Sequence, residues 1–228
     1  MLVYYNVDSN EFKRESQFSS TPAEVNFIFH APSDYSDIAS VTYGYRWFGT
    51  VYVDDDFTIP AGKRVTVNPG TAIKVSPGKK IIVNGTFELL GTSSEPITFD
   101  KNGSSNWYGI VINSASGSSS RIEYATIKNA SYGIYINGAS PEIYDTKINN
   151  CTYNVYISGG SPDLARNTIT YAGMHGVYCT NASPSFSPGT AYGDNVIREN
   201  EEIGIYAINN SSVFLGIVDL GGRNSIYG

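Results

Sequence analysis

The chain has 228 residues, of which 23 are Gly, 18 are Tyr and two are Met, a composition that favours strands and turns over long helices. Its formal net charge is −6 and it has no cluster of Lys and Arg, which argues against nucleic acid or an anionic membrane as the main partner. No apolar run approaches the ~20 residues that a membrane-spanning helix needs.

Residues 1–49 lie outside the repeats that follow them. Within this segment, residues 24–30 alternate as a strand does. Because the end of a repeat body exposes unpaired backbone and apolar side chains, we predict that residues 1–49 form an N-terminal cap. We assign residues 50–228 to one elongated repeat domain, whose C-terminal end we expect to be truncated or uncapped.

From residue 109 onward, a short motif returns about once every two dozen residues. It starts with Gly or Asn, continues with Ile or Val, and usually has Tyr next. Its first residues are Gly109, Gly133, Asn154, Gly176 and Gly204, which are separated by 24, 21, 22 and 28 positions. This period is too short for a pair of helices and close to one coil of a parallel β-solenoid.

Aligning the repeats on this motif predicts three short strands per coil, each with inward apolar columns. The first strand supplies two columns, Ile110, Ile134, Val155, Val177, Ile205 and then Ile112, Ile136, Ile157, Cys179, Ala207. The second strand supplies Ile122, Ile143, Leu164, Phe186 and Phe214. The third supplies Ile127, Ile148, Ile169, Ile197 and Ile226. We interpret Asn167, Asn195 and Asn224, which precede the third strand, as turn residues that tolerate positive φ.

Residues 57–110 resemble the opening coils of right-handed parallel β-helix repeat proteins of the pectate-lyase-like superfamily. The resemblance rests on Ile59-Pro60-Ala61-Gly62, Val67-Asn68-Pro69-Gly70-Thr71, Val83-Asn84-Gly85-Thr86, Leu90-Gly91-Thr92, Pro96-Ile97-Thr98-Phe99 and Trp107-Tyr108-Gly109-Ile110. With the later coils it covers roughly residues 50–228 and implies an all-β, right-handed parallel β-helix. It implies no single activity, because this superfamily contains lyases, glycoside hydrolases, epimerases, tail spikes and adhesins.

The outward position between the two inward columns of the first strand carries Tyr in four successive coils. These residues are Tyr135, Tyr156, Tyr178 and Tyr206, and Tyr132, Tyr153 and His175 flank them. Such a stripe can bind a glycan or a protein partner, and a ladder of like side chains also stabilises a parallel sheet by itself. We therefore name Tyr132, Tyr135, Tyr153, Tyr156, Tyr178 and Tyr206 as candidate ligand-binding residues.

Charged residues gather on another face of the coils. Glu142 and Asp163 are 21 residues apart, as are Asp145 and Arg166, and Lys147 lies close by, so coil spacing makes each pair vertical neighbours. This group could serve as an acid and base set or bind calcium, whereas a solvated ladder of ion pairs is the simpler interpretation.

No catalytic constellation is recognisable. The resemblance implies that lyases of this superfamily hold calcium with acidic residues on an outer strand face and use a nearby Arg or Lys as base. Here that face carries Tyr, with Asn137, Ser158 and Thr180 next along. A hydrolase would need a cluster of carboxylates around the sugar bond.

We expect no cofactor and no metal site, with calcium as the alternative. The run Asp54, Asp55 and Asp56 lacks the spacing of a calcium loop and predicts a solvated turn. His30 and His175 have no second ligand at metal-binding spacing. Cys151 and Cys179 fall at different places in the coil, so we expect free thiols.

The sequence thus favours a non-catalytic scaffold, secreted or at the cell surface, with a tyrosine stripe that can bind glycan or protein. The alternatives are a polysaccharide lyase or hydrolase whose site is incomplete in this chain, and a fibre subunit that associates end to end through its uncapped coil. An ice-binding role is weaker, because no outward column is a regular array of Thr.

Overall fold

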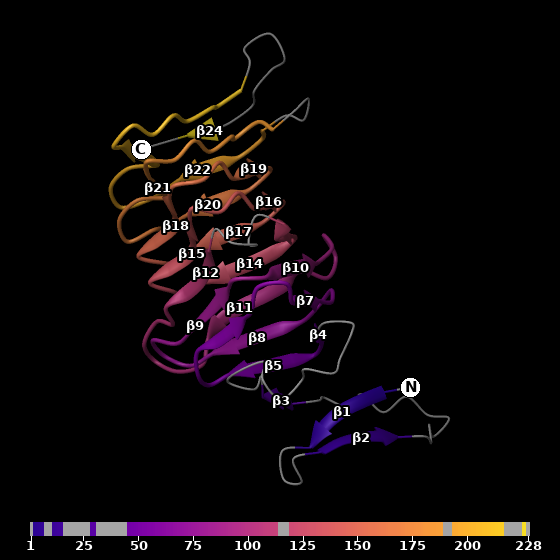
Figure 1. The fold of residues 1–228 in the computed structure, drawn as a ribbon. Helices are drawn as coiled ribbons and strands as arrows, with labels where there is room; N and C mark the ends of the chain where they lie inside the picture. The colour runs from indigo at the N-terminus through magenta and orange to yellow at the C-terminus, as the bar shows by residue number, and fades with distance from the viewer. Residues whose placement is uncertain are drawn as a thin grey trace.

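The computed structural model describes residues 2–6, 11–15, 28–30, 45–113, 119–188, 193–216 and 225–226. Nearly all of its strands belong to three parallel sheets that run along one stack of coils (Figure 1). From residue 45 to residue 170 the chain visits the three sheets in a fixed order, so each coil adds one strand to each sheet, whereas the described residues of the last two coils add strands to only two of them. Parallel pairing within these three sheets confirms the all-β solenoid that the repeat period predicted.

The first strand of each coil lies in a seven-stranded sheet. Its members are β6 (Phe57–Ile59), β9 (Lys80–Val83), β12 (Gly109–Asn113), β15 (Tyr132–Asn137), β18 (Tyr153–Ser158), β21 (Val177–Thr180) and β23 (Ile205–Ile208). The second strand lies in a six-stranded sheet of β4 (Tyr45–Trp47), β7 (Arg64–Val67), β10 (Thr86–Leu90), β13 (Arg121–Glu123), β16 (Glu142–Tyr144) and β19 (Asp163–Ala165).

The third strand of each coil lies in a nine-stranded sheet. Its members are β3 (Ile28–His30), β5 (Thr50–Val53), β8 (Ala72–Val75), β11 (Ile97–Lys101), β14 (Ala125–Lys128), β17 (Lys147–Asn149), β20 (Thr168–Thr170), β22 (Val196–Arg198) and β24 (Ser225–Ile226). β3 and β4 precede residue 50 and still pair in parallel with β5 and β7. β1 (Leu2–Asn6) and β2 (Glu11–Glu15) form a separate antiparallel pair. Much of 1–49 lies outside the described residues, so the cap stays a prediction.

The predicted inward columns form the core. Ile110, Ile134, Val155 and Val177 are in register and fully buried, and so are Ile127, Ile148, Ile169 and Ile197. The columns end at β23, where Ile205 is half-buried and Ala207 is exposed.

One member of the second column was predicted wrongly. Phe214 pairs with Ser185, which places Leu215 rather than Phe214 opposite the buried Phe186. Phe214 is 44% exposed, and Val213 and Leu215 point to the apolar end of the stack instead. The error is a shift of one residue, which in a strand moves a side chain to the other face.

The Asn residues before the third strand were also misinterpreted. The positive φ values lie one residue earlier, at Asp145 (50°), Arg166 (57°) and Asp194 (42°). Asn167 and Asn195 are instead fully buried. The Asn167 side chain donates to Ile143 O at 2.8 Å and to Asn195 Oδ1 at 3.0 Å, and it accepts from Thr146 N at 3.1 Å. These amides therefore join successive corners through side-chain hydrogen bonds; Asn224 lies outside the described residues.

Candidate functional site

The seven-stranded sheet presents an outward array of aromatic side chains, which we call the tyrosine face. It consists of Tyr108, Tyr132, Tyr135, Tyr153, Tyr156, His175, Tyr178 and Tyr206. Pairing between β15, β18, β21 and β23 places Tyr135, Tyr156, Tyr178 and Tyr206 in one register, one residue per coil. The structure therefore brings together all six tyrosines that the sequence singled out.

The rings of the tyrosine face alternate between parallel and perpendicular contacts. Tyr156 and Tyr178 are parallel within 10° at a centroid distance of 4.6 Å, and Tyr132 and Tyr153 are parallel within 8° at 5.6 Å. Tyr153 and Tyr156, which join these pairs, are 86° apart. Because Tyr156 and Tyr178 cover part of each other's ring faces, a ligand meets ring edges and hydroxyl groups there.

Three phenol groups on this face resist ionisation. Partial burial, and then the neighbouring tyrosines, raise the pKa of Tyr132 and of Tyr153 and raise the pKa of Tyr156 to about 12. The hydroxyl groups of these three tyrosines therefore stay protonated at neutral and mildly alkaline pH. In that form each can both donate and accept a hydrogen bond, which is the chemistry that sugar hydroxyls require.

A polar column runs beside the tyrosines on the same strands. Asn137 donates to Asn113 at 3.0 Å, and Asn113 donates to Asn84 at 2.8 Å, which forms an amide ladder across three coils. Ser158 and Thr180 continue the same register in the next two coils. The seven-stranded sheet thus offers aromatic and hydrogen-bonding groups side by side.

His175 extends the tyrosine face toward β23. Its ring lies 4.7 Å from that of Tyr206 and 5.9 Å from that of Tyr178, nearly parallel to both. Nε2 lies 3.3 Å from a carboxylate oxygen of Glu202, and the residue is only 7% exposed. Nδ1 is buried without a hydrogen-bond partner among the described residues.

Tyr108 was missed by the sequence analysis. Its ring lies 5.3 Å from that of Tyr132, and Lys80 Nζ lies 5.4 Å from its centroid. The available signal was its position directly before Gly109, which matches the position of Tyr132 before Gly133.

The charged residues on the other face fall into two groups. Glu142 and Asp163 are register neighbours in the six-stranded sheet, and burial together with Glu142 raises the pKa of Asp163. Asp145 and Arg166 lie at the following corner, where the guanidinium donates to both carboxylate oxygens, at 2.7 Å from Nη2 and 2.9 Å from Nε. Lys147 begins the next strand beside them. The vertical pairings are as predicted, and a catalytic or calcium-binding role stays a prediction.

Comparison with known protein families agrees with this geometry. Residues 80–217 match the family described as the right handed beta helix region, and this match covers more than half of the chain. The chain belongs to the right-handed β-helix family. Searches of curated proteins and of solved structures found no match.

No metal centre is formed by the described part of this β-helix, where no three His, Cys, Asp or Glu side chains lie close enough together. Calcium binding stays a prediction. Each acidic side chain of the run at 54–56 contacts the next coil: Asp54 accepts from Ser76, Asp55 pairs with Lys79, and Asp56 pairs with Lys80. The His30 side chain lies outside what is described.

The two thiols of the β-helix are free and buried, as expected. Burial raises the pKa of Cys151 and of Cys179 to about 12, so neither is a ready nucleophile. Within the described ranges, no helix has the length and apolar character needed to cross a membrane.

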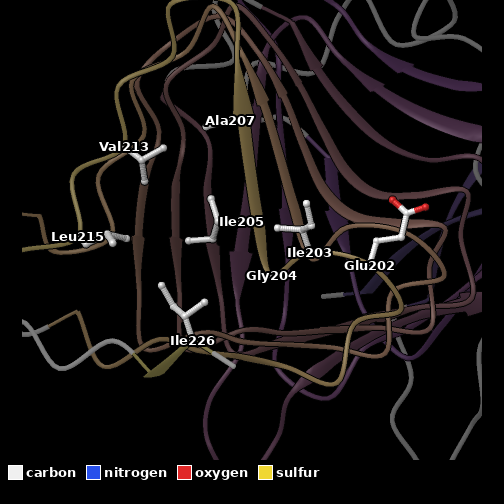
Figure 2. A pocket seen from close by; sticks show the side chains of 8 residues that line it. All are labelled: Glu202, Ile203, Gly204, Ile205, Ala207, Val213, Leu215 and Ile226. Atoms are coloured by element: carbon white, nitrogen blue, oxygen red, sulfur yellow. The ribbon is translucent and has the colours of Figure 1, made fainter. Parts of the chain in front are cut away.

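The C-terminal end of the β-helix presents an apolar hollow of about 550 Å³. Figure 2 shows Ile203, Ile205, Val213, Leu215 and Ile226 around it, with Glu202 at its edge. These side chains are the exposed end of the core columns. End-to-end association through this surface stays a prediction.

Proposed function

We propose that this protein is a non-catalytic β-helix module, secreted or displayed at a cell surface, that binds glycan through its tyrosine face. The observation that carries the proposal is the combination on one sheet of an ordered tyrosine array and a parallel column of amides and hydroxyls. Tyrosine suits a ligand that is apolar on one side and hydroxylated at its edges, because its ring has an apolar body and a polar tip.

The geometry favours hydrogen bonding over simple ring stacking. Tyr156 and Tyr178 partly cover one another, whereas the Tyr156 hydroxyl group stays protonated and Ser158 and Thr180 follow on the same two strands. A glycan chain that lies along the stack would meet one such set of groups in every coil, since neighbouring strands are ~4.8 Å apart.

A glycan array followed by calorimetric titration tests the proposal. Replacing both Tyr135 and Tyr156 with Ala should abolish binding, because it removes the centre of the face. Tyr156→Phe keeps the ring and removes only the hydroxyl, so it should weaken binding by about tenfold if hydrogen bonding dominates. Tyr171→Ala is the matched control, since Tyr171 is an exposed tyrosine on another turn.

Unchanged binding by the double variant, or no binding to any glycan, would count against the proposal. If the tyrosine face binds a protein instead of a glycan, the proposed binding site is correct and the proposed class of ligand is wrong. Reducing-end and unsaturated-uronate assays on a polysaccharide panel test the claim that the module is not an enzyme. Activity that Asp163→Asn abolishes would move the site to the charged face. Fractionation of the native cells tests the location.

A further inference from the structure

A polar groove lies at the corner between the six-stranded and nine-stranded sheets, away from the tyrosine face. It forms because the number of residues that join the two sheets differs from coil to coil. Residues 91–96 join β10 to β11, whereas a single residue, Tyr124, joins β13 to β14, and two residues each join β16 to β17 and β19 to β20. The resulting recess has a volume of about 240 Å³. Its lining includes Thr92, Ser93 and Pro96 from the long corner.

Three side chains in this groove occupy backbone positions that favour Gly. Tyr124, Asp145 and Arg166 have φ values of 48°, 50° and 57°, in the left-handed region where a side chain costs about 1 kcal/mol or more. Gly or Asn at each position would turn the corner with less strain. The same backbone conformation recurs at Asp194, so it belongs to the corner, and the turn itself does not explain which side chains stand at these three positions.

The Arg166 side chain is held rigidly and still has donors to spare. Asp145 accepts from its Nε and Nη2 atoms, and the guanidinium lies 5.4 Å from the centroid of the Tyr144 ring. Its Nη1 atom makes no hydrogen bond within the described parts of the chain. A guanidinium fixed on one side presents its remaining N–H groups in a set direction, which favours recognition of a planar or tetrahedral oxyanion.

Lys147 supplies a second positive charge to the groove. Its register neighbours in the nine-stranded sheet are Thr126 and Thr168, which also line the recess. Lys147 forms no salt bridge with any described residue. The lining therefore contains two cations and one carboxylate, with Thr126 and Thr168 on the strands on either side of Lys147.

We propose that this corner groove binds a small oxyanion, such as a phosphate, sulfate or carboxylate group, between Lys147 and the free edge of Arg166. Its volume suits the anionic group itself or the anionic group with one sugar ring, and lies below the range of about 300–1,000 Å³ that larger ligands occupy. The Thr hydroxyls complete the shell as donors. This site does not depend on glycan binding by the tyrosine face, because it lies on different sheets.

Titration calorimetry at low ionic strength, with the whole chain, tests the proposal. The probes are inorganic phosphate and inorganic sulfate in one arm, and glucose 6-phosphate and glucuronate in the other. Wild-type protein should bind at least one probe saturably, and added salt should weaken the binding. Lys147→Met should weaken it by about tenfold or more, because a charge-assisted hydrogen bond is lost.

Lys63→Met is the matched control, since Lys63 is an exposed lysine outside the groove. Lys147 is itself exposed, so its replacement should leave the melting temperature unchanged, which the same samples can show. Tighter binding of the sugar-borne anions would assign the ligand to a glycan, and equal binding would assign it to the free anion. Absence of saturable binding for all four probes, or equal binding by the Lys147 and Lys63 variants, overturns the proposal.

Discussion

The early and late coils of this β-helix place their aromatic residues on opposite sides of the wall. In the early coils, five buried aromatic rings form a chain of contacts at centroid distances from 5.1 to 6.2 Å, in the order Phe57, Trp47, Phe87, Phe99 and Trp107. The outward column of the same coils carries Thr58, Ile82 and Val111. In the late coils the outward column carries tyrosines, and the inward positions of β15, β18 and β21 carry Ile and Val with one Cys.

This difference separates residues that stabilise from residues that are available to a ligand. An aromatic side chain inside the stack gains stability from burial and packing, so its presence needs no further explanation. An aromatic side chain on the outside is only partly buried, so it gains less stability from burial and packing. The late coils keep six tyrosines outside although mostly aliphatic side chains, with Phe186, already fill their interior, which is why the outward array is the better candidate for function.

The largest effect should come from emptying the early interior. Phe87→Ala should lower the free energy of unfolding by about 3–5 kcal/mol, because Phe87 is fully buried and contacts both Trp47 and Phe99. Tyr178→Ala, outside in a late coil, should cost about 0.5–1.5 kcal/mol for its ring contacts. Urea unfolding measures both, and an equal loss in the two variants would contradict the comparison.

The stability of the late coils should depend on their buried Asn side chains. Asn167→Leu leaves the backbone groups of Thr146 and Ile143 and the side chain of Asn195 with one partner fewer. A buried group left unpaired costs about 1–3 kcal/mol, so a clear loss of stability is expected in thermal unfolding. Asn137→Leu is the control, because its amide belongs to the exposed ladder. If both variants melt alike, the buried ladder contributes no more than the exposed one.

Alkaline titration should detect the raised pKa of the tyrosine face. Tyr156 has a pKa of about 12 in the folded chain against an ordinary value of 10.0, so the unfolded chain loses its proton first as pH rises. The free energy of unfolding should therefore fall as pH rises through this interval, and part of the tyrosinate absorbance should develop late. Tyr156→Phe should remove part of the late phase. A single transition near the ordinary value would show that the face does not shield its phenols.

The smallest effect is expected at Asp163. Burial and Glu142 raise its pKa in the folded state, so the folded chain holds a proton that the unfolded chain has released, and stability falls as pH rises through this window. Asp163→Asn should raise stability at neutral pH by less than about 1 kcal/mol, and the gain should vanish in acid. Glu201→Gln, at an exposed position, serves as control. A gain that persists in acid would point to a cause other than charge.

Several features of this molecule could be predicted from the repeat period alone. A period near one coil with apolar residues two apart determines which side chains share a column, as Ile134, Val155 and Val177 do. The same alignment places the tyrosines one coil apart. It failed at Phe214, because β21 and β23 pair at a spacing of 28 residues whereas Ser185 and Phe214 pair at a spacing of 29, and a shift of one position reverses the face.

The sequence by itself determined the three-strand coil, the inward columns and the outward tyrosines, because period and alternation are local properties that repeat. Only the tertiary structure decided what depends on distance between coils. It showed that Asn167 and Asn195 are buried partners rather than strained turn residues, and that the tyrosine rings cover one another. It also showed that corners of unequal length leave a groove around Lys147 and Arg166. These contacts join residues about one coil apart in sequence, and their geometry is set by how the coils stack.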